Sequence, residues 1–548
     1  MLDKLLSNNW TKFWFALSVS SFIGLQISSG NRIGILLNIP LAFALALFIA
    51  YKYKVIDKLF EVKSKKYTII SILIAVYTTA EIILKFYSQW IRRFATSENP
   101  LAVEIRSLFP EHLLSVGLRM LAVAAGIVAL FFVFAVIYRI ISLFKNYTLY
   151  IIKSVDKNER LYIIIGTVIL AVFIIYVYSI TEVSYQTQVQ FDLIFTTDSG
   201  NYIYTDVFFS LYAAENDIRQ PLFALLTMPF AVVAKILAIP LFFLPSAYIL
   251  IMQLIQVIAL LIMAVLIARM SGIKESFSKT IFLILFSSTY PFLLFSFVVE
   301  QYIPSVFILV LVFYICLYKK RQNIVLLALS SGILLTNAII VPFITYERKI
   351  IAWIQSTIRV AVTFILLCLL SGKLSILFDA FYSIRSLLRF SDIGNINSVH
   401  YKIYQFTSFI ENCFIAPNTV ISGNNTFQLT IPMGISLVGV ALLCISIVSV
   451  ILNREMLFAR ICGLWVLFSI VLLYVIGWGS PENGMVLYSL YFNWAYFALV
   501  FLFIEKLFEK LKYVKYALYL VAFVVMAVIN IGGIVDLVRF GIQYYPAR

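Results

Sequence analysis

The chain has 548 residues, of which 62% are hydrophobic and 12% are charged, and its formal net charge is +16. Soluble domains are about 45–50% apolar and about 25% charged, so this composition excludes a protein with a single core in water. Apolar runs of about 20 residues recur along the sequence, the length that crosses a hydrocarbon layer roughly 30 Å thick. Because these runs are continuous rather than alternating, they predict transmembrane α-helices.

The positive charge does not predict a nucleic-acid partner. Lysines and arginines lie in short loops between apolar runs, where such residues orient the spans and contact anionic lipid. No basic cluster lies in a segment with the composition of a soluble domain. The composition therefore predicts membrane lipid as a partner and no nucleic acid.

Cysteine, histidine and short-motif patterns exclude several further classes of protein. The two histidines, His112 and His400, exclude a histidine-based zinc site, and the five cysteines lack metal-ligand or disulfide-framework spacing. The sequence has no Walker A motif, no Gly-x-Gly-x-x-Gly after a strand, no His-Glu-x-x-His and no Gly-x-Ser-x-Gly. Nucleotide-driven transport and the common soluble hydrolase mechanisms therefore lack their parts. No cleavable signal peptide is visible.

Residues 1–155 are predicted to form an N-terminal four-helix membrane extension of unknown role. Its spans are expected at about Phe13–Ser29, Ile35–Ala50, Tyr67–Phe86 and Leu114–Ile137. The loop between the second and third spans carries the densest group of lysines in the chain. Because positive charge is enriched in cytoplasmic loops, this loop and the N-terminus are predicted to be cytoplasmic.

Residues 156–548 form the second predicted region, which begins with an outward span at Leu161–Ile180. The first outer loop is predicted at residues 181–245. Its first part, Thr181–Gln220, carries several acidic residues and a single base, Arg219. This negative charge, opposite to that of the basic loops, fits the outer side of the membrane. Its second half, Pro221–Pro245, is apolar but is expected to be broken by Pro229 and Pro240. We therefore predict an interfacial helix there rather than a span.

The remaining apolar runs alternate in direction. The predicted full spans are Ser246–Ala268, Thr280–Phe297, Ile303–Leu317, Ile350–Leu370, Ile431–Leu452, Ile461–Gly477, Met485–Ile504 and Tyr516–Val535. Ile324–Tyr346 would disturb the alternation as a full span, so it is predicted to be a broken or re-entrant hairpin with Gly332 and Asn337 near its tip. Residues 371–430 form a second outer loop.

These elements add up to an all-α polytopic integral membrane protein. We predict about 13 transmembrane helices, one re-entrant hairpin and interfacial helices, with the C-terminus outside. The short loops and the absence of targeting signals favour the cytoplasmic (plasma) membrane of a bacterium.

Three segments of the second region carry a resemblance to a known family. They are Phe195–Tyr202 (Phe-Thr-Thr-Asp-Ser-Gly-Asn-Tyr), Asn216–Phe223 (Asn-Asp-Ile-Arg-Gln-Pro-Leu-Phe) and Ser331–Asn337 (Ser-Gly-Ile-Leu-Leu-Thr-Asn). In this order, with an acidic outer loop before an apolar helix, they resemble the GT-C superfamily of membrane glycosyltransferases, over about Tyr162–Val535. The third segment looks like the Gly-Leu-x-x-Leu-Thr-Lys stretch of that family, with Asn337 where Lys is common.

The resemblance implies an enzyme that moves a sugar from a polyprenyl-phosphate carrier to an acceptor at the outer face of the membrane. The acceptor would be a glycan, lipid or protein of the cell envelope. An acidic residue of the first outer loop is catalytic in this family, which assigns Asp198 here as the general base or as a ligand of a divalent cation, Mg²⁺ or Mn²⁺. Asp192 and Asp206 are the second choices, and a solvated loop aspartate is the structural alternative.

Asp217, Arg219 and Glu300 are candidate substrate-binding residues. Asp217 and Arg219 directly precede the predicted interfacial helix, where an acid near the helix start and a base at the membrane surface are also simple structural choices. Glu300 stands alone between two apolar runs. An ionisable residue at membrane depth is a candidate functional residue, whereas a carboxylate in a tight outer turn is structural.

The outer loops contain the remaining candidates for substrate binding. Residues 371–430 contain Arg385 and Arg389, four positions apart on one predicted helix face, followed by His400, Tyr401 and Lys402. Such side chains can hold a carrier phosphate, or can rest on lipid headgroups. Glu482 lies in another outer turn before an aromatic-rich helix; a carbohydrate site and an interfacial aromatic belt both fit this pattern.

Three other functions stay open at this point. A transporter or flippase for a lipid-linked glycan would place charged residues along the middle of its spans. A polysaccharide polymerase or ligase would use arginines and a histidine in a large outer loop, as Arg385, Arg389 and His400 allow. A non-catalytic membrane scaffold is the fourth possibility. The sugar and the acceptor are not indicated by any residue pattern.

Overall fold

The computed structural model describes the second region almost throughout and the first in short pieces. The described residues are 44, 71–72, 74–81, 137–138, 140–143, 145–151, 153–183, 193–195, 197, 199–200, 205–211, 219–244, 246–320, 323–346, 349–371, 373, 391, 399–479 and 485–547. The predicted span Phe13–Ser29 and nearly all of Ile35–Ala50 and Leu114–Ile137 lie outside them. Within Tyr67–Phe86, residues 71–72 and 74–81 are helical, as predicted.

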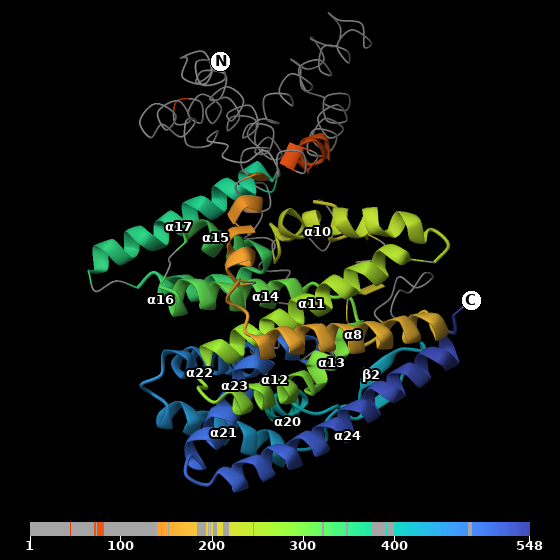
Figure 1. Cartoon of the computed structure of the whole chain (residues 1–548), viewed down its shortest axis with the longest axis vertical. Coiled ribbons are helices and arrows are strands. Elements are labelled where there is room, and N and C mark those ends of the chain that lie inside the picture. The colour runs from red at the N-terminus through yellow and green to blue at the C-terminus, as the bar shows by residue number, and fades with distance from the viewer. Residues whose placement is uncertain are drawn as a thin grey trace, which may run out of the picture.

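The described part of the second region is mostly helical (Figure 1). Its elements are α8 (Lys157–Ile180), α10 (Phe223–Ala238), η2 (Ile239–Leu241), α11 (Ala247–Met270), α12 (Ser276–Ser287), α13 (Tyr290–Phe297), α14 (Tyr302–Val312), η3 (Phe313–Tyr318), α15 (Ile324–Ile333), η4 (Leu335–Ile340), α16 (Val341–Ile344), α17 (Ile350–Leu370), α20 (Val399–Asn412), β1 (Thr419–Ile421), β2 (Phe427–Leu429), α21 (Leu437–Leu452), α22 (Leu457–Ser469), η7 (Ile470–Val475), η8 (Met485–Tyr488), α23 (Ser489–Leu507) and α24 (Lys512–Tyr544).

Among the described residues, seven helices are long and apolar enough to cross a membrane, or eight if one bent pair is counted as a span. The seven are α8, α10 with η2, α11, α17, α22 with η7, η8 with α23, and α24. The chain is therefore a helical protein with the features of a membrane protein. The run that the sequence predicts as Ile350–Leu370 is α17 with those same bounds.

Two central helices organise the bundle. α11 packs against α8, α10 and α14, and α23 packs against α20, α21 and α22 (Figure 1). α11 and α23 are also the most buried of the seven apolar helices, whereas α8, α17 and α24 keep most of their apolar side chains on the outside. An exposed apolar surface on peripheral helices is what a lipid environment permits.

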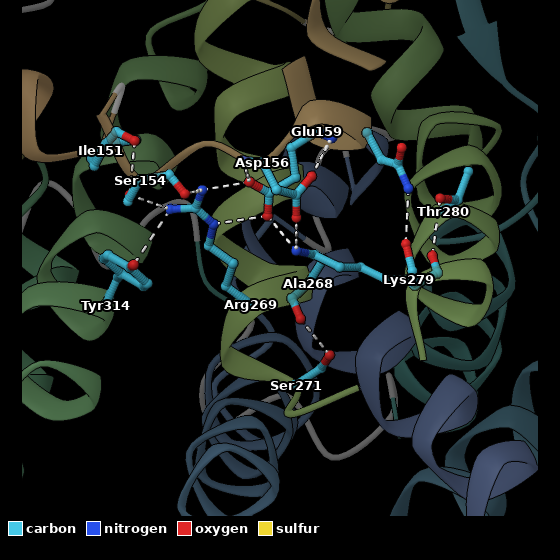
Figure 2. A network of polar contacts seen from close by, with 12 residues as sticks. Ile151, Ser154, Asp156, Glu159, Ala268, Arg269, Ser271, Lys279, Thr280 and Tyr314 are labelled. Atoms are coloured by element: carbon cyan, nitrogen blue, oxygen red, sulfur yellow. Dashed lines mark hydrogen bonds and ion pairs between the residues drawn. The ribbon is translucent and has the colours of Figure 1, made fainter. Parts of the chain in front are cut away.

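Buried charges join α8, α11 and α12 at one end of the bundle (Figure 2). Asp156 caps α8 in a capping box with Glu159, whose side chain is only 1% exposed. Both carboxylate oxygens of Glu159 are paired, with Arg269 at the end of α11 and with Lys279 in the first turns of α12. Arg269 also donates to the carbonyl and hydroxyl oxygens of Ser154, at 2.9 Å each.

A second charged group lies at the same end. Lys515, near the start of α24, contacts Glu505 at 3.1 Å and Glu275 at 3.5 Å, and Tyr516 donates to Glu275 at 2.7 Å. The Tyr516 hydroxyl group and the nearby lysines hold the pKa of Glu275 below its usual value. We call this end, defined by Glu159 and Lys515, the ion-pair end. These ion pairs bring together the starts of α8, α12 and α24 and the ends of α11 and α23. The charge pattern of the sequence predicts that these five helix ends lie in the cytoplasm.

The opposite end joins the end of α8 to the end of α24. The amide of Glu182 donates to Tyr545 O at 2.8 Å, and the Thr181 hydroxyl donates to the same oxygen at 2.7 Å. The short antiparallel hairpin β1–β2 lies at the same end, where Phe427 of β2 packs on Phe540 of α24. This hairpin and α20 are regular elements within residues 371–430, which the sequence predicts only as a loop.

The run predicted as one span at Thr280–Phe297 is instead two helices, α12 and α13, bent by 61°. Pro291 lies in the first turn of α13 and has no N–H to continue a helix from α12. Asn530 of α24 compensates for the break: its Nδ2 donates to Ser288 O at 2.6 Å and Phe414 O at 2.8 Å, and its Oδ1 accepts from the Ala416 amide. Composition alone does not reveal the bend, because every residue around it suits a span.

Two proline-containing runs behave differently from each other. The prediction that Pro229 breaks its run is wrong, since α10 continues through it; only Pro240 coincides with a change, to the 3₁₀ turn η2. α10 together with η2 is long and apolar enough to cross a membrane, where the sequence predicts an interfacial helix. The run Ile324–Tyr346 is broken as predicted, at Leu334, whose backbone is extended between α15 and η4.

We expect Glu159→Gln to lower the free energy of unfolding by about 1.5–3 kcal/mol, because it removes the buried carboxylate that accepts from Arg269 and Lys279 and leaves Lys279 paired with Asp156 alone. Thermal unfolding of the purified protein in detergent measures the change. Glu455→Gln is the control, since Glu455 is 93% exposed and its contact with Arg454 is at 3.6 Å. An equal effect of both variants would contradict a structural role for the Glu159 cluster.

Candidate functional site

Two of the three motif segments lie against each other. The Leu335 amide donates to Arg219 O at 2.7 Å, and the Leu222 amide donates to Gly332 O at 2.8 Å. Residues 219–222, at the start of α10, are therefore bonded across the break between α15 and η4. Segments that are more than 100 positions apart in the sequence form one local structure.

Gly332 is the position that permits this close approach. A Cβ atom built at Gly332 would lie 2.3 Å from Leu222 Cδ1 and 2.7 Å from Leu222 Cβ. No side chain fits in that space without moving α10 away from α15. The glycine of the third motif is thus explained by backbone approach rather than by a turn conformation.

Asn337 and Tyr491 connect the broken helix to the bundle centre. The Asn337 side chain is fully buried, its Nδ2 donates to Ser330 O at 3.2 Å, and its Oδ1 accepts from the Tyr491 hydroxyl at 2.6 Å. The Thr336 and Tyr491 hydroxyl oxygens are 3.0 Å apart. Asn337 is therefore a neutral amide that bonds to the backbone freed by the break.

Glu300 lies inside the bundle and not in a surface turn. It is 0% exposed and sits in the link between α13 and α14. Gln256 of α11 donates to Glu300 O at 3.1 Å, and Gln253 donates to Phe297 O, the last carbonyl of α13. Gln256 is about 14 Å along α11 from Ala247, at a rise of 1.5 Å per residue. Glu300, which bonds to Gln256, therefore lies at that depth along α11 and not at its Ala247 end.

We call the buried polar groups of these breaks the polar cluster, defined by Gln253, Gln256, Glu300, Asn337 and Tyr491. Each glutamine and asparagine in it bonds to backbone that a helix break leaves without helical partners. Tyr302 and Tyr488 extend the cluster with an aromatic surface, their ring centroids 5.7 Å apart. The cluster combines a carboxyl group, amides and tyrosines, the side chains that commonly bind polar ligands such as sugars.

An apolar groove adjoins the polar cluster. Its walls are η3, the returning segment of η4 and α16, and α22 with η7. Trp465 lines the groove, donates to Tyr491 O at 2.8 Å, and packs on the Tyr491 ring at 5.1 Å. A second hollow, lined by Met270, Leu317 and Met456, continues it toward the ion-pair end. From Leu457 to Val471 the groove follows α22 for roughly 20 Å.

The first motif segment lies at the opposite end, beside the β-hairpin. The Phe195 amide donates to Phe427 O at 2.8 Å, and the Phe195 ring packs edge-on against Tyr290 at the start of α13. Phe195 has a φ of 47°, a left-handed conformation that turns the chain after Ile194. Asp198 itself lies outside the described residues, as does Asp192.

Asp206, a second choice for the catalytic acid, is engaged in a contact of its own. Its carboxylate accepts from Lys235 of α10 at 2.6 Å and from the Tyr248 hydroxyl at 2.9 Å. Lys235 also lies over the rings of Phe209 and Tyr248. These contacts support a structural role for Asp206, which ties the outer loop to α10 and α11.

The other predicted residues are only partly placed. His400 is exposed and Lys402 is buried, both in the first turn of α20, and α20 packs against η8 and α23, which carry Tyr488 and Tyr491. Tyr401 lies between them. Asp217, Arg385, Arg389 and Glu482 lie outside the described residues, so the phosphate-binding roles predicted for this group stay predictions.

Three functional candidates were absent from the sequence predictions: Gln253, Gln256 and Trp465. The glutamines lie in an apolar span, where an amide is costly unless it is bonded, and that cost is a signal the sequence does carry. Nothing in the sequence marks Trp465 among the many aromatic residues. Only the packing of Trp465 on Tyr491 distinguishes it.

The part of the chain that the structure describes contains no group of side chains that could bind a divalent cation. There, no three His, Cys, Asp or Glu side chains gather closely enough to hold a metal ion. The expected ligand Asp198 is outside that part. We therefore derive no chemical step through a metal ion.

Comparisons with known proteins give no relative. No protein-family model matches the chain, and neither a curated protein nor a solved structure matches it significantly. The function is therefore argued from the residues and their arrangement.

We expect Gly332→Ala to destabilise the protein by about 1–3 kcal/mol, because the new methyl group overlaps the Leu222 side chain. Because Leu222→Ala is itself destabilising at a buried position, the two changes are compared in a double-mutant cycle: Gly332→Ala should lower the unfolding temperature in detergent less in the Leu222→Ala background than in wild type. Gly532→Ala on α24 is the matched control, since a Cβ there meets nothing within 4 Å. An equal cost of Gly332→Ala in the two backgrounds would show that the outer atoms of the Leu222 side chain do not cause the conflict, since only the Leu222 Cβ, at 2.7 Å, remains in Leu222→Ala.

Proposed function

We propose that the chain is a membrane glycosyltransferase of GT-C type that uses a polyprenyl-phosphate sugar and acts at the outer face of the cytoplasmic membrane. The observation that carries this proposal is the contact between the apolar groove and the polar cluster at Trp465 and Tyr491. A ligand with a long apolar chain and a polar head would lay its chain in the groove and its head beside the polar cluster. The pairing of residues 219–222 with 332–335 supports it further, because it joins two of the three segments that carry the family resemblance.

The groove is long enough to hold a lipid chain over the depth of one leaflet. One leaflet is about 15 Å deep, half of a hydrocarbon layer of roughly 30 Å, whereas the groove follows α22 for roughly 20 Å. Its lining side chains, such as Phe313, Leu464 and Phe468, are apolar. A carrier lipid lying there would bring its phosphate toward Asn337, Tyr491 and the segment that carries Arg219.

The reaction would then proceed with the roles that the sequence predicts. A carboxylate, assigned to Asp198, takes the proton from the acceptor hydroxyl as that oxygen bonds to the anomeric carbon of the sugar. The bond between this carbon and the carrier phosphate oxygen breaks, and the phosphate leaves with the electron pair. Arg219, whose carbonyl oxygen bonds to the Leu335 amide of the broken helix, would stabilise the charge that develops on the phosphate. Glu300 and the tyrosines would bind sugar hydroxyl groups.

The depth of Glu300 favours a second candidate function, a transporter or flippase for a lipid-linked glycan. Such a protein needs polar groups along its spans, and Glu300, Gln253 and Gln256 lie inside the bundle. The polar cluster would then line the path of the sugar headgroup. The acidic outer loop has no task in this mechanism, which is why we place the transferase first.

We expect Asp198→Asn to abolish sugar transfer and Glu300→Gln to slow it by about 10²-fold or more, because the first removes the base and the second removes a buried carboxylate from the sugar site. Radiolabelled polyprenyl-phosphate sugars, offered to purified protein with an envelope extract as acceptor, provide the assay. Glu455→Gln, on an exposed loop, is the control.

The same two variants distinguish the alternatives. Transfer by wild type that is lost in Asp198→Asn establishes the transferase. No transfer by wild type, together with flipping of a lipid-linked sugar in liposomes that Glu300→Gln stops and Asp198→Asn leaves intact, would replace it with the transporter. Wild-type turnover by Asp198→Asn would remove Asp198 as the base.

We expect Leu464→Trp to raise the KM for a long-chain carrier several-fold and to leave the KM for a short-chain analogue unchanged, because the indole group fills the groove and not the polar cluster. Steady-state transfer with carriers of two chain lengths measures this. Val438→Trp, on the exposed face of α21, is the control. Equal effects on both carriers would show that the chain does not occupy the groove.

A further inference from the structure

The N-terminal extension contacts the first outer loop at Glu81 and Tyr77. Glu81, in the helical segment 71–81, accepts from the Ser210 hydroxyl at 2.7 Å and from the Leu211 amide at 3.2 Å. The Tyr77 ring packs on Phe209, with centroids 4.3 Å apart. A side chain from the region of unknown role thus bonds to the loop that precedes α10.

The contact covers one face of the helical segment. Ser71, Ile74, Ala75 and Thr78 are buried, at the spacing that places residues on a single face of a helix. The Thr78 hydroxyl lies 3.8 Å from the sulfur of Met228 in α10. Val76, on another face, is 46% exposed. The segment therefore packs against both the loop and α10.

The same loop residues are held from the other side by the bundle. Asp206 pairs with Lys235 and Tyr248, and the Thr227 hydroxyl of α10 donates to Phe208 O at 2.9 Å. Asp206 has a φ of 54° and begins a turn that its carbonyl oxygen closes with the amides of Phe209 and Ser210. The turn Asp206–Leu211 is therefore clamped between the N-terminal extension and α10.

We propose that the N-terminal extension positions the outer loop of the active region, with Glu81 as the positioning residue that fixes the turn Asp206–Leu211. This turn lies between the two motif segments that carry Asp198 and Asp217, so its place limits where both segments can lie. Glu81 contacts no reacting group and acts through the backbone of the turn. The consequence for catalysis rests on the proposed function, whereas the clamp itself does not.

The chemistry of the contact predicts which substitutions matter. The Leu211 N–H needs an acceptor in a setting with little water, and losing it costs more than losing a solvated bond. Glu81→Gln keeps a carbonyl oxygen that can accept this bond, whereas Glu81→Leu offers none. We expect amide exchange in residues 205–211 to rise about 10-fold in Glu81→Leu and to stay near the wild-type rate in Glu81→Gln.

Hydrogen–deuterium exchange of the full chain in lipid nanodiscs tests the clamp without any substrate. Val76→Leu is the matched control, since it places the same side chain on an exposed face of the same segment. Ser210→Ala approaches the contact from the loop side and should raise exchange in the same peptide by a smaller factor. A peptide from α24 reports whether the fold is intact.

The outcomes separate the clamp from the proposed function. Faster exchange confined to residues 205–211 in Glu81→Leu, but not in Glu81→Gln or Val76→Leu, supports the clamp whether or not sugar transfer is detected. Unchanged exchange in Glu81→Leu, or a rise spread over α24 as well, overturns it; if that variant does not fold, unchanged exchange in Ser210→Ala does the same. Where transfer is measurable, a lower kcat in Glu81→Leu restored by Glu81→Gln links the clamp to catalysis, and an unchanged kcat removes that link.

Discussion

The interior of this protein depends on buried amide side chains that bond to the backbone where helices break. Asn530 serves the bend between α12 and α13, Gln253 and Gln256 serve the link that follows α13, and Asn337 serves the break after α15. A membrane interior supplies no water for such groups, so each break requires a partner within the protein. These amides make it possible for helices to end inside the bundle rather than at its surface.

The breaks in turn create the polar cluster. Because α13 ends early, its link to α14 carries Glu300 into the bundle, and because α15 ends at Ile333, Asn337 reaches Tyr491. A straight span over Thr280–Phe297 would have carried Glu300 to a surface loop. The helix breaks therefore place these polar groups inside the bundle. In other membrane proteins, too, irregular backbone within the membrane lines a binding site.

The two ends of the bundle differ in how they are held. At the ion-pair end, Glu159, Arg269, Lys279 and Lys515 join helix ends through charges. At the opposite end, backbone bonds and aromatic contacts join Thr181, Phe195, Phe427 and Tyr545. The polar cluster and the groove lie between the two ends. A ligand bound there would lie between the ion-pair end and the loops that carry the motif segments.

The sequence by itself determined the helical membrane class and the bounds of long spans such as α11 and α17, because apolar run length and charged flanks are local properties. It also indicated the break near Gly332, where the charge alternation fails. Only the tertiary structure decided the bend at Pro291, the depth of Glu300, the pairing of Leu222 with Gly332 and the contact of Glu81 with Leu211. Each of these features joins residues that are far apart in the chain or depends on how the helices pack. Hydropathy does not indicate which polar groups contact each other.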